Sequence, residues 1–249
     1  MPATGASIGT PGRRNEDRFA IGPDWAFVLD GATAPSGVDS GCVHDVVWLV
    51  RRLGGALAEL LTISDDPLAD LLAEAIDRVR AAHADTCDLN NPNSPSSTAT
   101  LLRRGEGTEY LVLADSPLVL DVGGEVRAVV DDRIDHLPSR TLDAVTELRN
   151  SDGGFWVAST KPEAAHQAVT GTLPPFRRAA LLTDGASRLV DHFALTDWRG
   201  LLDLLEEEGP ATLLAQVRQA ESTNPPPARA KPHDDATALF WLPAPHPSH

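Results

Sequence analysis

Apolar and polar residues follow two different periods along this chain, which indicates a mixture of strands and helices. Gly123-Gly124 separates two short apolar runs and predicts a hairpin. Residues rich in β-branched and apolar side chains predict strands at 18–21, 25–29, 97–102, 110–114, 118–122, 126–130, 178–183 and 236–242. Longer segments with apolar residues at helical spacing predict helices at 43–63, from 68 onward, at 198–208 and at 211–221.

The order of these elements indicates the fold class. Helices do not alternate regularly with strands, which disfavours a parallel, doubly wound sheet. We therefore expect an α+β protein in which antiparallel sheets are covered by pairs of helices. No change in composition marks a domain boundary, so residues 1–242 are expected to form a single domain. The segment 243–249, PAPHPSH, is expected to be a disordered tail.

Composition narrows the range of partners and locations. The 249 residues include 36 acidic and 21 basic ones, a net charge of −15 that argues against a nucleic-acid surface. No apolar run approaches the roughly 18 residues that span a membrane, so no membrane association is expected. The N-terminus lacks the apolar stretch of a secretory signal. Cys42 and Cys87 form no disulfide framework by their spacing, so a reducing cytoplasm is the predicted location.

Two similar segments occur far apart in the chain, AFVLDGAT at 26–33 and ALLTDGAS at 180–187. Each is an apolar run followed by Asp-Gly-Ala and a hydroxyl residue. One interpretation is a pair of tight turns, because Asp-Gly is a common turn dipeptide. The other is that the carboxylates of Asp30 and Asp184 meet at one charged site.

Further carboxylates also lie where predicted strands begin or end, namely Glu16, Asp17, Asp115, Asp234 and Asp235. Taken singly, each is more often a turn, a solvated loop or a charged strand end. Gathering carboxylates is costly unless cations neutralise them, and Mg²⁺ and Mn²⁺ prefer oxygen ligands. No HxxxH, HExxH or cysteine pair offers a zinc site in the sequence.

The order of the acidic motifs is more specific than any one of them. The motifs RRNED, VLDGA, SSTATLL, LADSPL, LLTDGAS and HDDATALF follow one another over residues 16–242. This succession resembles that of the metal-dependent type 2C protein phosphatases, the PPM family, and the chain looks like a divergent bacterial member. The resemblance implies a four-layer α-β-β-α sandwich, with two antiparallel sheets flanked by helix pairs.

The resemblance also implies a site for two Mg²⁺ or Mn²⁺ ions. In this similarity Asp30 corresponds to the carboxylate that bridges both ions, and Asp234 is preferred to Asp235 because it stands three residues before Thr237. Asp115 would belong to a third, weaker ion site. Two ions roughly 3.5–4 Å apart can share a water and lower its pKa, which makes it the expected nucleophile. The implied metal-site residues are Glu16, Asp30, Gly31, Asp115, Asp184 and Asp234.

The chain departs from the family pattern at two positions near this site. Gly12 stands where the family has an arginine, and Arg13 and Arg14 are the candidates to hold the phosphate instead. Ala32 stands where many members have a histidine that is a candidate general acid. His44 lies at the start of the next helix, where a partly buried structural role is the commoner one.

We expect from this resemblance a divalent-metal-dependent phosphomonoesterase that acts on phosphoserine and phosphothreonine in a protein partner. Two alternatives stay open. One is a pseudophosphatase-like protein that binds a phosphorylated partner without hydrolysis, and the other is a phosphatase of a phosphorylated small molecule. The segment 131–173 has no obvious match, and its Phe155 and Trp156 are either core residues or a recognition surface.

Overall fold

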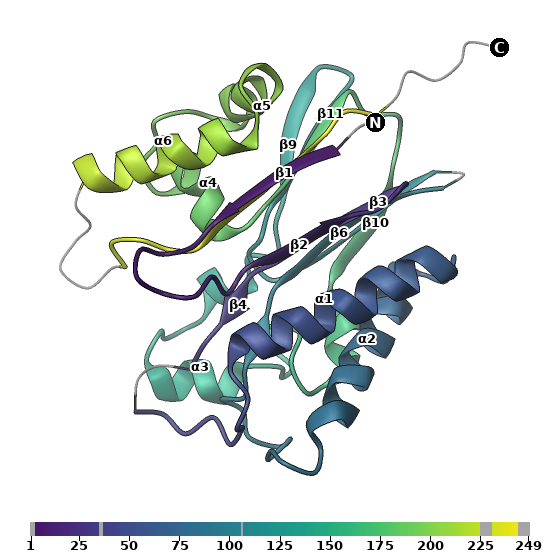
Figure 1. The fold of residues 1–249 in the computed structure, drawn as a ribbon, viewed down its shortest axis with the longest axis vertical. Coiled ribbons are helices and arrows are strands. Elements are labelled where there is room, and N and C mark those ends of the chain that lie inside the picture. The colour runs from purple at the N-terminus through teal and green to yellow at the C-terminus, as the bar shows by residue number, and fades with distance from the viewer. Residues whose placement is uncertain (1–2, 35–36, 106, 225–230, 244–249) are drawn as a thin grey trace.

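A computed structural model describes residues 3–34, 37–105, 107–224 and 231–243, and two antiparallel five-stranded sheets form its centre (Figure 1). The first sheet has the order β1 (Ala3–Ile8), β12 (Ala236–Trp241), β11 (Arg178–Leu182), β8 (Leu118–Val122) and β9 (Glu125–Val129). The second has the order β10 (Val169–Leu173), β7 (Thr108–Leu113), β6 (Ala99–Arg104), β3 (Trp25–Leu29) and β2 (Arg18–Ile21).

Helices cover the outer face of each sheet, as Figure 1 shows. The long helices α1 (Val46–Ile63) and α2 (Leu68–His83) pack on the second sheet through one apolar cluster. A separate cluster joins the first sheet to α4 (Asp184–Asp191), α5 (Trp198–Glu207) and α6 (Pro210–Thr223). Between the sheets, residues such as Val28, Leu102, Leu120 and Leu239 form a third buried cluster. The predicted α+β sandwich with antiparallel sheets and flanking helices is therefore confirmed.

Shorter elements lie between these layers. They are β4 (Gly31–Ala32), β5 (Ser96–Ser97), the 3₁₀ helices η1 (Arg133–His136) and η2 (Pro162–Gln167), and α3 (Leu142–Leu148). The predicted strand 97–102 is divided at Thr98, where the chain passes from the β4–β5 pair to the second sheet. The predicted helix 43–63 begins only at Val46, because Asp45 caps it by accepting a hydrogen bond from the amide of Trp48.

The sequence pattern missed one strand and left the position of two aromatic residues open. The Gly- and Pro-rich start contains β1, which pairs with β12 along its whole length. Phe155 and Trp156 are only 3% and 8% exposed, so they belong to the core and do not form a recognition surface. The predicted loop 224–231 and the predicted tail 243–249 lie almost entirely outside the described residues.

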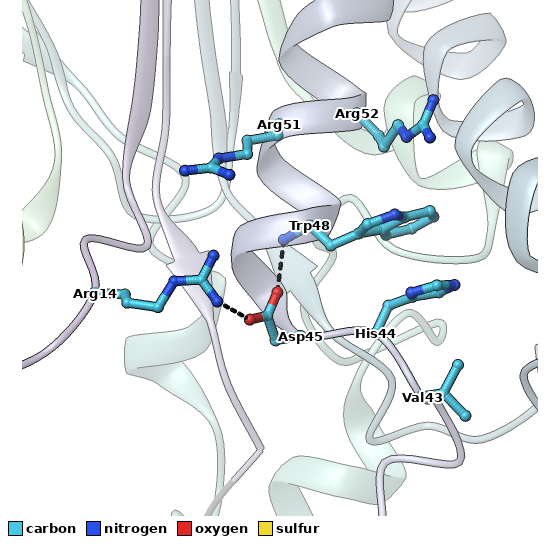
Figure 2. Close-up of a pocket in the computed structure, with 7 residues that line it drawn as sticks. All are labelled: Arg14, Val43, His44, Asp45, Trp48, Arg51 and Arg52. Atoms are coloured by element: carbon cyan, nitrogen blue, oxygen red, sulfur yellow. Dashed lines mark hydrogen bonds and ion pairs between the residues drawn. The ribbon is translucent and has the colours of Figure 1, made fainter.

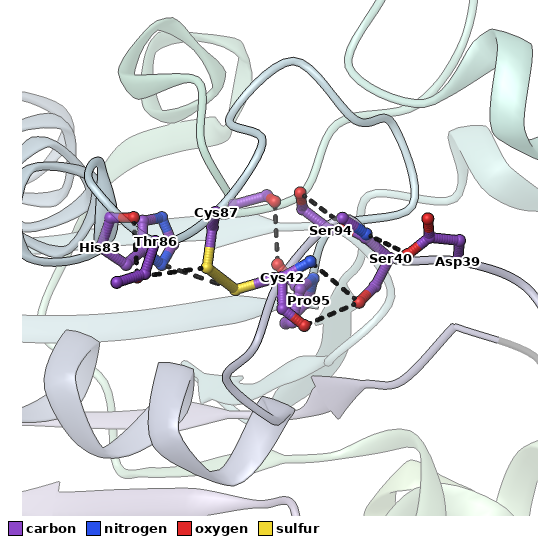
Figure 3. Close-up of a disulfide and its surroundings, with 10 residues drawn as sticks. Asp39, Ser40, Cys42, His83, Thr86, Cys87, Ser94 and Pro95 are labelled. Atoms are coloured by element: carbon purple, nitrogen blue, oxygen red, sulfur yellow. Dashed lines mark hydrogen bonds between the residues drawn. A yellow bond between two sulfur atoms is a disulfide. The ribbon is translucent and has the colours of Figure 1, made fainter.

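The two cysteines also correct an expectation. Cys42 and Cys87 form a disulfide that links the loop before α1 to the segment after α2 (Figure 3). The spacing of the cysteines in the sequence gave no sign of this pairing, because it depends on how the two helices fold back on each other. Among the described residues, no helix is long and apolar enough to cross a membrane.

Candidate metal centre

The predicted acidic residues gather where strands of the two sheets end. Asp30 follows β3 of the second sheet, and Asp184 follows β11 of the first sheet as the first residue of α4. Asp115 lies between β7 and β8, and Asp234 lies just before β12. These four carboxylates act on one another electrostatically, since Asp184 raises the pKa of each of the other three.

Both Asp-Gly pairs need glycine for close backbone contacts. A Cβ atom on Gly31 would lie 2.5 Å from the carbonyl oxygen of Glu16, and one on Gly185 would collide with the carbonyl oxygen of Asp235. Each glycine therefore lets a second acidic segment of the chain approach the strand end. The repeated Asp-Gly motif does not mark two simple turns, because β4 follows Asp30 and α4 begins at Asp184.

A buried hydrogen-bond network around Asp17 joins the two sheets at this point. The Asp17 Oδ2 atom accepts hydrogen bonds from the hydroxyls of Thr183, at 2.9 Å, and Thr237, at 2.7 Å. Burial, with the charges of Asp235 and Asp184 adding to it, raises the pKa of Asp17 to about 7. Its other oxygen, Oδ1, is buried without a hydrogen-bond partner among the described residues.

Asp30 and Asp115 share this low-dielectric environment. Thr98 fixes the backbone of Asp30, because its hydroxyl accepts from the Asp30 amide at 3.1 Å and its amide donates to the Asp30 carbonyl at 2.9 Å. Burial and then the charge of Asp184 raise the pKa of Asp30 well above its usual range. The same two causes raise the pKa of Asp115 to about 6. Such shifts are the expected sign of carboxylates that a cation would stabilise.

The backbone before Asp115 has an unusual conformation. Ala114 has a φ of 66°. This left-handed conformation favours glycine, so alanine bears strain there. The Ala114 amide donates to Oδ2 of the buried Asp131 at 3.0 Å, and this hydrogen bond holds the strained backbone in place.

Asp234 and Asp235 have different surroundings. Asp235 is buried, and its two carboxylate oxygens accept from the amides of Thr10 and Glu16, each at 2.6 Å. Asp234 is half-buried, and burial followed by the charge of Asp184 raises its pKa. Its oxygens lie 3.0 and 3.1 Å from Nζ of Lys231. Asp235 therefore fixes the backbone, whereas the Asp234 carboxylate binds Lys231 and is acted on electrostatically by Asp184.

The two candidate arginines line the same pocket but differ in their ion-pair partners. Arg13 lines a pocket of about 310 Å³ together with Glu16, Lys231 and Asp234. Burial raises the pKa of Glu16, and the hydrogen bond from the Thr33 hydroxyl opposes that rise. Arg14 lines the same pocket, but its guanidinium binds the Asp45 carboxylate at 2.6 Å.

Sequence reasoning left three residues out of the site. Asp17 belongs to the acidic pair of the RRNED motif, in which the resemblance implies Glu16 as the metal-site residue. Lys231 lies in a Pro-rich stretch that gives no functional signal. Asp191, at the end of α4, has its pKa raised mainly by burial and also by the charge of Asp184. One α-helical repeat of seven residues separates Asp191 from Asp184, and only knowledge of α4 would have revealed that they share a face.

The chemistry of this donor set fits hard divalent cations. Every acidic candidate offers oxygen, several carboxylates are destabilised in their charged form, and Asp17 Oδ1 has no hydrogen-bond partner within the described part of the chain. A second group of potential ligand atoms, from Cys42, His83 and Cys87, also lies close together. Its sulfurs are joined in the disulfide, so they are not thiolate ligands.

The family follows from a comparison of sequences. A family model described as Protein phosphatase 2C matches residues 4–218. The chain belongs to this family. No curated protein matches it.

Solved structures of protein phosphatase 2C relatives show the same fold at low identity. The PPM Ser-Thr phosphatase MsPP from Mycobacterium smegmatis, in complex with cacodylate, is 19% identical, with a TM-score of 0.60 over 96% of this chain and 97% of that one. The catalytic domain of PstP, in complex with two manganese ions, is 15% identical, with a TM-score of 0.59 over 96% of both chains. Stp1 from Staphylococcus aureus is 15% identical, with a TM-score of 0.60 over 97% and 94%.

Proposed function

We propose that this protein phosphatase 2C family member is a divalent-metal-dependent phosphatase of phosphoserine and phosphothreonine in proteins. The observation that carries this proposal is the convergence of Asp30, Asp115, Asp184 and Asp234 at strand ends of opposite sheets, with the pKa of three of them raised. Residues 1–242 would form the phosphatase-like domain.

The acidic residues would hold the metal ions at separate positions. Asp30, Asp184 and Asp234, with the Gly31 carbonyl and Glu16, would hold two Mg²⁺ or Mn²⁺ ions, and Asp115 a weaker third. When bound, such ions supply an activated water and offset charge on the phosphoryl oxygens. Two manganese ions are present in the related PstP structure, which supports the ion type. Thr98 and the Asp17 network fix the strand ends, so the ligands need little reorganisation.

Among the side chains of this protein, Arg13 is the candidate to bind the substrate phosphate. It lines the pocket that contains Glu16 and Asp234, and its charge lowers the pKa of Glu16 as a minor effect. A guanidinium binds phosphate through two parallel hydrogen bonds, which would orient the phosphorus atom. Gly12 is exposed, with no atom of the described residues within 4 Å of a Cβ added there, and it supplies no such group.

The test is phosphate release from an aryl phosphate and from a phosphothreonine peptide in Mn²⁺, with chelator as the blank. Asp30→Asn is expected to reduce kcat by about 100-fold or more, the scale of losing one transition-state contact. Asp24→Asn is the matched control, because Asp24 lies exposed at the opposite end of β3. Full activity of Asp30→Asn would show that the site is misassigned.

The same experiment separates the alternatives. Mn²⁺ binding without turnover on either substrate would favour a pseudophosphatase-like binding protein, which the displaced arginine and Ala32 motivate. Turnover of phosphorylated metabolites but not of phosphopeptides would favour a small-molecule phosphatase. The cytoplasmic location rested partly on unpaired cysteines, and the disulfide removes that support, so it stays a prediction to be tested by cell fractionation.

A further inference from the structure

A second pocket, of about 490 Å³, adjoins the candidate metal centre and has the opposite charge. It is lined by three guanidinium groups and one carboxylate, together with Val43, His44 and Trp48 (Figure 2). The chain as a whole has a net charge of −15, so this surplus of positive charge is local. We call it the arginine pocket, and its charged residues are Arg14, Asp45, Arg51 and Arg52.

We propose that the arginine pocket binds acidic groups that flank the phosphorylated residue of a protein substrate, and so selects acidic phosphopeptides. This proposal rests on the proposed function and adds a substrate class to it. Carboxylate and phosphate groups are the ligands that guanidinium recognises best, through paired hydrogen bonds.

One wall of the pocket is a stack of side chains that orders Arg52. The His44 ring stacks on Trp48 with a centroid distance of 4.1 Å, and the Arg52 guanidinium carbon lies 5.7 Å from the Trp48 ring centre. Arg52 follows Trp48 by four residues on α1, so these two side chains lie on one side of the helix, whereas Arg51 points to the side on which Arg14 lies (Figure 2). This arrangement reduces the side-chain entropy that binding would cost.

Asp45 ties the pocket to the loop that carries the metal-site residue Glu16. Its Oδ1 accepts from the Trp48 amide at 2.8 Å, and its Oδ2 accepts from Arg14 at 2.6 Å. Arg14 also lines the pocket that contains Glu16 and Asp234. The two pockets therefore meet at Arg14, and one extended peptide can place its phosphate in one and an acidic neighbour in the other.

The remaining two arginines have no ion-pair partner in the part of the chain that the structure describes. On a chain with 36 acidic residues, Arg51 and Arg52 are left beside a third guanidinium without neutralisation. Their charges repel one another, and a bound anion would relieve that repulsion. Because both are exposed, the attraction should be screened strongly by salt.

The test compares two phosphothreonine peptides that differ only in flanking Glu or Gln residues. For the wild-type protein in Mn²⁺, we expect kcat/KM to be about tenfold higher for the acidic peptide, the sum of two or three exposed charge pairs. The Arg51→Gln/Arg52→Gln variant should lose this preference, mainly through KM. Raising the ionic strength from about 0.01 M to about 1 M should also remove it, since the Debye length falls from about 30 to about 3 Å.

A matched control removes the same charge elsewhere. Arg78→Gln/Arg80→Gln changes two exposed arginines of α2 outside the pocket and should keep the wild-type preference. Equal effects of both double variants, or a wild-type protein without preference, would overturn the proposal. If no substrate is hydrolysed, fluorescence anisotropy of the two peptides still decides, because only the pocket predicts arginine-dependent binding of the acidic one.

Discussion

The two Asp-Gly segments are nearly identical in sequence and differ in structure. After Asp30 the chain forms the two-residue strand β4, Gly31–Ala32, and the next helix, α1, has its N-cap only at Asp45. At Asp184-Gly185 the chain instead begins α4. The residues that follow explain the difference, since the first segment continues with Pro and Gly and the second with Ser-Arg-Leu-Val, which sustains a helix.

The difference gives the two carboxylates different environments. Asp30 is half-buried, and its pKa is raised well above the usual range by burial and by Asp184. Asp184 is exposed in the first turn of α4, where the helix N-terminus favours negative charge. The same dipeptide thus supplies one half-buried carboxylate with a raised pKa and one exposed carboxylate at the start of a helix. The environment of an Asp-Gly dipeptide therefore depends on the segment that packs against it.

The largest expected effect comes from the glycines of the two segments. Gly185→Ala should lower the free energy of unfolding by more than about 4 kcal/mol, because its Cβ would collide with the backbone of Asp235. Gly31→Ala should cost less, about 1–3 kcal/mol, because the Glu16 segment is a loop that can shift. Urea unfolding monitored by circular dichroism measures both.

The control for this pair is a glycine with free space around it. Gly55 is exposed in α1, with no atom within 4 Å of an added Cβ. Gly55→Ala should therefore stabilise the protein, by up to about 1 kcal/mol. A Gly185→Ala protein as stable as the wild type would show that the two acidic segments do not pack as described.

A smaller effect should follow from reducing the disulfide near the first segment. The Cys42–Cys87 bond joins residues 45 apart in sequence and anchors the chain at Cys42, shortly before α1 begins. Its reduction should lower the free energy of unfolding by about 2–4 kcal/mol. Urea unfolding with and without a phosphine reductant measures this. The Cys42→Ser/Cys87→Ser variant should have the same urea midpoint as the reduced protein, and the reductant should not change that midpoint. If the wild-type protein exposes two titratable thiols after reduction but keeps its midpoint, the prediction is contradicted.

Much of the fold was predictable because it depends on local pattern. The strand at 118–122 and the strand that follows Gly123-Gly124 were predicted from alternation and turn chemistry, and both exist within a residue of the predicted bounds. The β1 strand, ATGASI, has no apolar alternation to detect. It is a strand because its backbone pairs with β12, and this pairing depends on contacts between the two ends of the chain.

The candidate site was predictable in residue type, but its internal arrangement was not. Asp30, Asp115, Asp184 and Asp234 were selected by motif order, and the structure brings them together. The ion pair that Arg14 forms and Arg13 does not was not predictable, because it depends on the position of Asp45 in space. The place of the cysteines and of Phe155 likewise depends on long-range packing.

The pH dependence of the free energy of unfolding should reflect the buried carboxyl group of Asp17. Burial raises the pKa of Asp17 from 3.8 to about 7, so the folded protein retains a proton that the unfolded chain releases between these values. The stabilising contribution is therefore complete below about pH 4 and is lost as the pH rises through about 7. Urea midpoints in chelator across this range should show a smaller decline for Asp17→Asn than for the wild type.

Two further measurements check the origin of this slope. Asp24→Asn, at the far end of β3, should keep the wild-type pH dependence. Saturating Mn²⁺ should reverse the contribution of the acidic cluster, because divalent ions bind deprotonated carboxylates. If Asp17→Asn and the wild type decline equally in chelator, Asp17 is ionised in the folded protein.

The smallest expected effect concerns the hydroxyl that ends each segment. The Thr33 hydroxyl donates to the Glu16 carboxylate at 2.8 Å, whereas the Ser187 hydroxyl donates to the backbone carbonyl of Asp184 at 3.0 Å. Only the first bond involves a side chain of the candidate metal site, and it opposes the burial that raises the pKa of Glu16. Thr33→Val should therefore raise this pKa further, as measured by carbon NMR of the carboxyl group, at a stability cost of about 1 kcal/mol or less. Ser187→Ala should leave the Glu16 titration unchanged. An unaltered Glu16 titration in Thr33→Val would show that the shared hydroxyl has the same, purely local, role in both segments.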